Sequence, residues 1–360
     1  MFPTYAPWHP RIQEETLKQA TRNGGRLMLL DVQLGSACNG HCPRCDSSCA
    51  ALSEPAELDI DAVAALAAEI DKRNEARIPN VGFVCGLGEP TFGRNLIILK
   101  KLIAATADCH FVWSIFNNGI YWDDELEEYV KDGRLAVMVQ YNSDRPETVA
   151  EMLGVGPELA ARHIANRRHL LMLARELGQR CNSGVTNIAA SIVPERGNLG
   201  ELMGIIDQCV SNGVFPLIGE LENAGDSENE YYAEHKLSNE ELTDLHAQIG
   251  RRFGINYEVP FCPAAIGAIH VNNRNIVTVD KLTGLSCSWF GMSNPEPYEI
   301  GDIRKMSYDG IVRMVMAYRD ARIPEVRKAI QEYPEMVFGG CGGNARMLLE
   351  KYVSLYGGGK

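Results

Sequence analysis

The sequence contains no apolar run close to the roughly 20 residues that a membrane-spanning helix needs. Its first eight residues, Met1 to Trp8, have no basic stretch followed by an apolar one, so they do not resemble a secretion signal. Positive charge is also scarce, because 35 Lys and Arg stand against 47 Asp and Glu, for a net charge of −12. Non-specific binding to a phosphate backbone needs a positive surface field. The composition therefore predicts a cytoplasmic protein without a nucleic-acid or membrane partner.

What is present is ordinary globular composition with an unusual amount of cysteine. The chain has 360 residues, of which 45% are hydrophobic and 23% charged, so a packed protein of roughly two domains is expected. The 11 cysteines lie in a long chain without a secretion signal. In that setting cysteines indicate metal or redox chemistry more often than disulfides.

Short apolar runs alternate with helical patterns between positions 27 and 221, which is typical of βα units and a parallel sheet. Asn198 and Ser238 are predicted to cap helices, and Ser238 has Glu241 in capping-box position. Six such units form either an open doubly wound sheet or an incomplete barrel. The predicted strands are Leu27–Leu34, Val81–Cys85, Phe111–Phe116, Leu135–Tyr141, Asn187–Val193 and Phe215–Leu221.

The βα rhythm stops after Gly254. Ile269–Val271 and Ile276–Val279 flank a polar turn and predict a hairpin. We therefore expect a domain boundary between roughly 235 and 256, followed by a smaller domain that carries cysteines.

Three cysteines, Cys38, Cys42 and Cys45, follow the first predicted strand at steps of four and three residues. Three thiolates can hold three irons of a 4Fe-4S cluster and leave the fourth iron without a protein ligand. The alternative is a structural zinc site, which needs four ligands and could recruit His41 or Cys49.

This spacing resembles the C-x3-C-x2-C signature of the radical S-adenosylmethionine (radical SAM) superfamily. The resemblance implies a partial (β/α)6 TIM barrel over 27–235, preceded by an N-terminal extension over 1–26. It also implies that S-adenosylmethionine binds the open iron and is cleaved to a 5′-deoxyadenosyl radical. Arg44 departs from the family, because many members carry an aromatic residue before the last cysteine to pack on adenine.

Catalytic residues of parallel βα folds sit at the carboxyl ends of the strands, here called the rim. Other polar residues are predicted at this rim, beside the three cysteines. Gly86, Gly88 and Glu89 follow the second strand and resemble the family's Gly-Gly-Glu segment, which implies contact with the methionine part of the cofactor. Asn142 and Ser191 end two later strands and are candidates for the ribose hydroxyls.

Four further residues are predicted to act on substrate. Glu220 and Glu222 are two residues apart, so in a strand both side chains point the same way, although a solvated strand end explains them equally well. Tyr141 could line the same pocket. Cys181, which precedes the fifth strand, is a candidate hydrogen-atom donor, with core packing as the alternative.

A second cysteine set, Cys262, Cys287 and Cys341, surrounds the predicted hairpin and a Gly-rich segment. The order of these motifs resembles the C-terminal SPASM or twitch extension of radical enzymes, which holds auxiliary iron-sulfur clusters. The resemblance implies one such cluster in a domain over 257–360, joined by a linker helix over 236–256. The alternative is that these are buried reduced thiols.

The resemblance implies an oxidoreductase or epimerase that removes hydrogen from a small polar molecule, such as a sugar, aminocyclitol or nucleoside intermediate of natural-product biosynthesis. The alternative within the family is modification of a ribosomal peptide, and a remote one is a non-enzymatic iron-sulfur or zinc protein. An external one-electron reductant such as flavodoxin or ferredoxin is expected as a partner.

Overall fold

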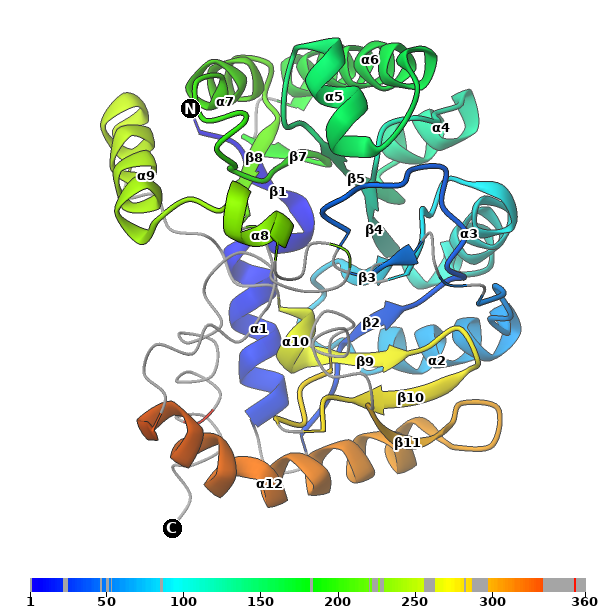
Figure 1. Ribbon diagram of the computed structural model, residues 1–360. Coiled ribbons are helices and arrows are strands. Elements are labelled where there is room, and N and C mark those ends of the chain that lie inside the picture. The colour runs from blue at the N-terminus through cyan, green and yellow to red at the C-terminus, as the bar shows by residue number, and fades with distance from the viewer. Residues whose placement is uncertain are drawn as a thin grey trace.

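The computed structural model describes residues 2–21, 25–45, 47–49, 52, 54–84, 87–181, 184–219, 221, 226, 230–255, 263–281, 283–286, 297–332 and 353. Its centre is a nine-stranded sheet in the order β11-β10-β9-β2-β3-β4-β5-β7-β8 (Figure 1). The stretch from β2 to β8 is parallel throughout. This confirms the predicted α/β fold with six parallel strands.

The six parallel strands lie close to their predicted positions. They are β2 (Leu29–Val32), β3 (Asn80–Val84), β4 (Phe111–Asn117), β5 (Leu135–Gln140), β7 (Ile188–Ile192) and β8 (Phe215–Ile218). Strands β2, β3 and β8 are buried over their whole length, as expected for a parallel sheet that is covered on both faces. Strand β8 ends three residues before the predicted end at Leu221.

Helices cover the outer face of these strands (Figure 1). They are α2 (Ile60–Lys72), α3 (Gly93–Ala105), α4 (Asp124–Lys131), α5 (Pro146–Leu153), α6 (Pro157–Cys181) and α7 (Leu202–Ser211), with the 3-10 turn η3 (Ala107–Cys109) after α3. Helix α2 buries Val63, Leu66 and Ile70, which lie on one face at three- and four-residue steps, and its N-cap is Asp59.

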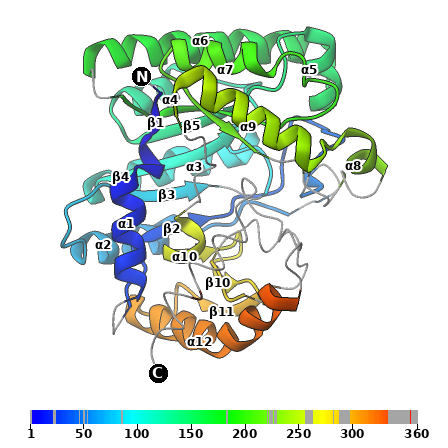
Figure 2. The same ribbon diagram turned by 90° about the vertical axis from the view of Figure 1, so that its left-hand side faces the viewer.

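The N-terminal extension packs on the inner face. It forms β1 (Thr4–Tyr5), which pairs with β6 (Val185–Thr186), then η1 (Ala6–Trp8) and α1 (Pro10–Thr21), which runs from β1 towards α12 (Figure 2). The Tyr5 hydroxyl lies 2.9 Å from Ser114 Oγ of β4. Neighbouring Trp113 bonds outward to Thr106 after α3, so Ser114 and Tyr5 face the opposite, inner side.

The carboxyl-terminal part continues the same sheet. Strand β9 (Ala268–Val271) is parallel to β2 and forms the predicted hairpin with β10 (Ile276–Val279), which pairs with β11 (Tyr298–Asp302). Helix α12 (Tyr308–Glu332) lies along β11 (Figure 1). One continuous sheet contains strands from both sides of the predicted boundary between 235 and 256. The division into a barrel and a C-terminal domain therefore stays a prediction.

Two connecting helices and one short helix precede that hairpin: α8 (Glu230–His235), α9 (Asn239–Phe253) and α10 (Ala264–Gly267). Helix α9 has the predicted capping box, in which Ser238 Oγ accepts from the Glu241 amide and Glu241 accepts from the Ser238 amide. The cap predicted at Asn198 is wrong. Its side chain instead braces the loop before α7, accepting from Glu195 N and donating to Val193 O.

Candidate functional site

The three cysteines of the C-x3-C-x2-C motif lie in the loop that follows β2, here called the thiolate loop (residues 35–49). All three side chains are half-buried. The start of the loop is held by Asn95 of α3, whose side chain accepts from Gly35 N at 2.9 Å and donates to the carbonyls of Gly35, Ala37 and Glu89. One buried amide thus fixes the loop to α3 and to the segment after β3.

The thiols lie close enough to influence one another electrostatically. The pKa of Cys38 is raised to about 11 and that of Cys42 to about 12, mainly by burial, and a neighbouring thiolate at Cys45 contributes to both shifts. A hydrogen bond from Cys49 lowers the pKa of Cys45 to about 6. Thiolate is the form that binds metal, so ligation at Cys38 and Cys42 must displace protons.

Cys49 is the fourth thiol of the thiolate loop. It is buried, its backbone amide lies 3.5 Å from Cys45 Sγ, and its own sulfur accepts from Gly88 N at 3.0 Å. Among the described residues, no three Cys, His, Asp or Glu side chains converge as a single metal ion requires. Cysteines of a four-iron cluster bind different irons, so they need not converge on one point. Both the cluster and the zinc alternative stay predictions at this point.

Gly88 brings the segment after β3 against the thiolate loop. Its φ is +65°, and a Cβ at this position would lie 2.3 Å from Gly35 O and 2.7 Å from Ala37 O. The Glu89 amide donates to Ala37 O at 2.9 Å. Only glycine fits this close approach of two backbones, which gives the sequence motif its structural reason.

Glu89 accepts several hydrogen bonds at the rim. Its carboxylate accepts from Thr91 N, Thr91 Oγ1, Asn117 Nδ2 and Asn118 N. Burial raises its pKa, and the hydrogen bonds oppose that rise. Asn118 in turn donates to Asn39 of the thiolate loop at 2.7 Å. Glu89 therefore ties the ends of β3 and β4 together, and its role as a direct cofactor contact stays a prediction.

The ends of β5 and β7 complete the rim. Asn142 Oδ1 accepts from Val193 N at 2.7 Å, and Ser191 is paired with Gln140 across the two strands. Gln140 Oε1 is buried and has no hydrogen-bond partner in the described structure. An orphaned acceptor at this edge fits a bound molecule that donates a hydrogen bond.

Tyr141 faces the opposite way. Its hydroxyl donates to Asp144 and Gln208, and the Arg167 guanidinium lies 3.8 Å from its ring centroid. Burial raises its pKa. Gln208 and Arg167 lie on the outer helices α7 and α6, so the Tyr141 side chain points outward. Successive side chains of an extended chain point to opposite sides, so that of Gln140 points inward. The placement supports packing in place of the catalytic role that we predicted from sequence.

Several predicted site residues lie outside what the structure describes. They are Gly86, Glu220, Glu222, Cys262, Cys287 and Cys341. Strand β8 ends at Ile218, before both glutamates. Cys181 is the last residue of α6, and its side chain is not described. The roles of these residues stay predictions.

Three residues of the rim were not predicted from the sequence: Asn95, His163 and Glu195. His163 of α6 contacts the residue that follows β4, with its Nδ1 2.6 Å from Asn118 O, and burial lowers its pKa to about 4. Glu195 pairs with Arg44. Nothing in the spacing of these residues marks them, because each lies in a different βα unit from its partner.

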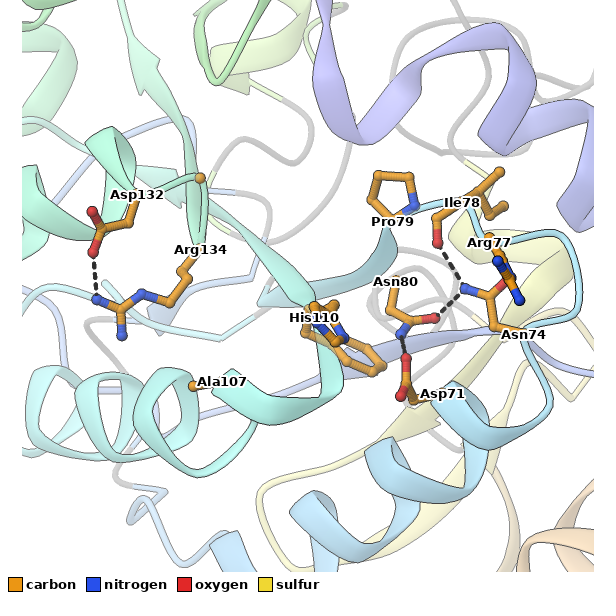
Figure 3. A pocket seen from close by; sticks show the side chains of 12 residues that line it. Asp71, Asn74, Arg77, Ile78, Pro79, Asn80, Ala107, His110, Asp132 and Arg134 are labelled. Atoms are coloured by element: carbon orange, nitrogen blue, oxygen red, sulfur yellow. Dashed lines mark hydrogen bonds and ion pairs between the residues drawn. The ribbon is translucent and has the colours of Figure 1, made fainter.

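A second polar region lies at the opposite end of the strands. A groove of about 540 Å³ is lined by residues at or just before the starts of β3, β4 and β5, including Asn80, His110 and Arg134 (Figure 3). Asp132 pairs with Arg134, and Asn80 bonds to Asn74. The groove is separated from the thiolate loop by the length of the strands.

No family model matches the sequence, and no curated protein matches it. Among solved structures, the fold is similar to that of radical SAM enzymes, in agreement with the fold class predicted from the sequence. Streptococcus suis SuiB bound to precursor peptide SuiA aligns at TM-score 0.53 and 12% identity, over 86% of this chain and 70% of SuiB. anSMEcpe with bound AdoMet (S-adenosylmethionine) aligns at TM-score 0.53 and 12% identity, over 91% of this chain and 96% of anSMEcpe. In the described residues, no helix has the length and apolar character to span a membrane.

Proposed function

We propose that this chain is a radical SAM enzyme. The observation that carries the proposal is the packing of the Gly88 segment directly against a loop that carries three half-buried thiols, at the carboxyl end of a parallel barrel. When bound, the cluster and S-adenosylmethionine supply reductive carbon–sulfur cleavage and the removal of an unactivated hydrogen from substrate.

The residues of this chain bind and position. Cys38, Cys42 and Cys45 would hold the cluster and leave one iron free of protein ligands. Asn95 and Gly88 fix the loop that carries them, and Gln140 offers an unused acceptor at the inner rim. Rigid placement of the reacting groups is the main contribution that a protein makes to such chemistry.

The substrate we favour is a peptide. SuiB is similar in fold and was solved with a precursor peptide, and anSMEcpe was solved with a Cp18Cys peptide. These likenesses support a peptide substrate over a sugar, aminocyclitol or nucleoside, and such a small molecule becomes the second candidate.

Whether the outcome is oxidation or epimerisation depends on the fate of the substrate radical, and an auxiliary cluster at Cys262, Cys287 and Cys341 would accept its electron.

The test begins with anaerobic reconstitution with iron and sulfide, followed by dithionite, with flavodoxin as a second electron donor. The proposal predicts that S-adenosylmethionine is converted to 5′-deoxyadenosine. The same enzyme is then offered a displayed library of random peptides and, separately, a panel of aminocyclitols, sugars and nucleosides. A peptide mass change supports the favoured substrate, and a change confined to the small molecules supports the second.

Deuterated water separates the two reaction outcomes. Solvent deuterium at one inverted carbon indicates epimerisation through a thiol such as Cys181, and an oxidised product without label indicates dehydrogenation. If a preparation with a full iron complement forms no 5′-deoxyadenosine, the proposal is overturned.

A further inference from the structure

A buried ion pair connects the thiolate loop to the loop after β7. Arg44 lies between Cys42 and Cys45, and its Nη1 is 2.6 Å from Glu195 Oε1 in the loop after β7. The two side chains are only 6% and 1% exposed. A guanidinium does not lose its proton in a protein, so a buried one requires a counter-charge.

The same carboxylate holds α8. Glu195 Oε2 accepts from the Tyr231 hydroxyl at 2.8 Å, and the Tyr231 ring stacks on His235 with centroids 3.9 Å apart. Nearby, the Asp226 amide donates to Cys45 O at 2.7 Å. The segment that contains α8 is therefore attached to the thiolate loop directly at Cys45 and through Glu195 at Arg44.

The Arg44–Glu195 ion pair has no net charge, but Arg44 lies next to the proposed cluster ligands Cys42 and Cys45. The positive charge of Arg44 acts on the Cys42 thiol, and Glu195 balances that charge from the far side. Charges interact strongly in a poorly solvated environment. The reduction potential of an iron-sulfur cluster depends on nearby charge and on solvent exposure.

We propose that Arg44 and Glu195 form a charge-balanced pair that docks α8 on the thiolate loop and sets the reduction potential of the cluster bound there. Arg44 is a positioning residue in this account. The inference rests on the proposed function, because it requires a cluster at Cys38, Cys42 and Cys45.

The test is an anaerobic redox titration of the reconstituted holoenzyme, followed by electron paramagnetic resonance. Glu195→Gln leaves an unbalanced positive charge, which favours the reduced cluster, so the midpoint potential rises. Arg44→Gln leaves an unbalanced negative charge, so the potential falls. The double variant removes both charges and returns the potential close to that of the wild type. Arg44→Lys keeps the charge and is expected to stay close to the wild type.

Docking has its own readout. Tyr231→Phe keeps both charges, so the potential stays unchanged, while amide hydrogen exchange over 230–236 becomes at least several-fold faster. Should either single variant fail to bind iron, the double variant must restore binding, and its failure to do so would overturn the inference. Single variants that bind iron and shift in the same direction, or not at all, also overturn it. A wild-type chain that binds no four-iron cluster defeats the proposed function itself.

Discussion

The two ends of the barrel are built from the same strands but use their polar residues differently. At the amino end of the strands, Asp132 pairs with Arg134, which also lies over the Tyr129 ring, and Asn80 is bonded to its neighbours. At the carboxyl end, polar side chains join separate loops to one another, and Gln140 Oε1 has no partner in the described structure. The comparison teaches that one end stabilises the fold, while the other holds several loops in position around half-buried thiols.

The largest effect is expected within the thiolate loop itself. Cys42→Ala removes one of the three ligands of the cluster in the thiolate loop, so the iron of that cluster should be lost and 5′-deoxyadenosine formation should fall by at least 100-fold. Cys49→Ala is the matched control, because this buried thiol lies beside Cys45 but is not a ligand in our account. Iron analysis and a product assay compare the two variants. Equal loss of iron in both would show that Cys49 is a fourth ligand and that no iron is open.

The close approach at Gly88 comes next. Gly88→Ala places a Cβ 2.3 Å from Gly35 O, so the thiolate loop must shift, and we expect at least a 10-fold weaker affinity for S-adenosylmethionine. Gly93 has a similar φ of +57°, with nothing within 4 Å of its Cβ position. Gly93→Ala should therefore cost about 1 kcal/mol of stability from backbone strain alone. Equilibrium binding and urea unfolding measure both variants, and similar affinities would refute the role of the close approach.

A pair of buried asparagines compares the two ends directly. Asn95→Ala frees the start of the thiolate loop and should lower both stability and 5′-deoxyadenosine formation. Asn80→Ala, at the amino end, removes hydrogen bonds to Asp71 and Cys109 O and should cost about 2 kcal/mol with little change in the rate at 25 °C. If Asn80→Ala lowered the rate as much as Asn95→Ala, the functional distinction between the ends would be wrong.

The last prediction is a pH dependence at the rim, which is nearly absent at neutral pH and develops only in acid. Burial lowers the pKa of His163 to about 4, whereas it is about 6.5 in an unfolded chain. Between these values the unfolded state binds a proton that the folded state excludes, so stability falls as pH drops from about 6.5 towards 4, by about 3 kcal/mol in all. His163→Gln should remove this contribution, and His169→Gln, exposed on the same helix, should retain it. Urea unfolding of the wild type and both variants at several pH values measures this contribution to the free energy of unfolding.

Local patterns predicted much of the fold. Buried β-branched runs located all six parallel strands, and Ser238 with Glu241 located the start of α9, because strand burial and capping depend on nearby residues. The cap at Asn198 was wrong because its side chain could also brace the preceding loop. Such competition between local partners is decided by the surrounding packing.

The site was predicted only where the motif is local. Cys38, Cys42 and Cys45 lie within eight residues, and Gly88 follows a strand, so spacing could locate them. Tyr141 was assigned to the pocket although strand alternation turns it towards α6 and α7. Asn95 and Glu195 contact the thiolate loop from 60 and 151 residues away, and such contacts are set by tertiary packing that one sequence does not reveal.

The most direct test of the central claim is electron paramagnetic resonance of the dithionite-reduced wild-type protein, recorded before and after addition of S-adenosylmethionine. An iron left free of protein ligands predicts a 4Fe-4S signal that changes shape when the amino and carboxylate groups of the cofactor bind it. A spectrum that is indifferent to S-adenosylmethionine, or a preparation in which zinc occupies the three cysteines, would contradict the account.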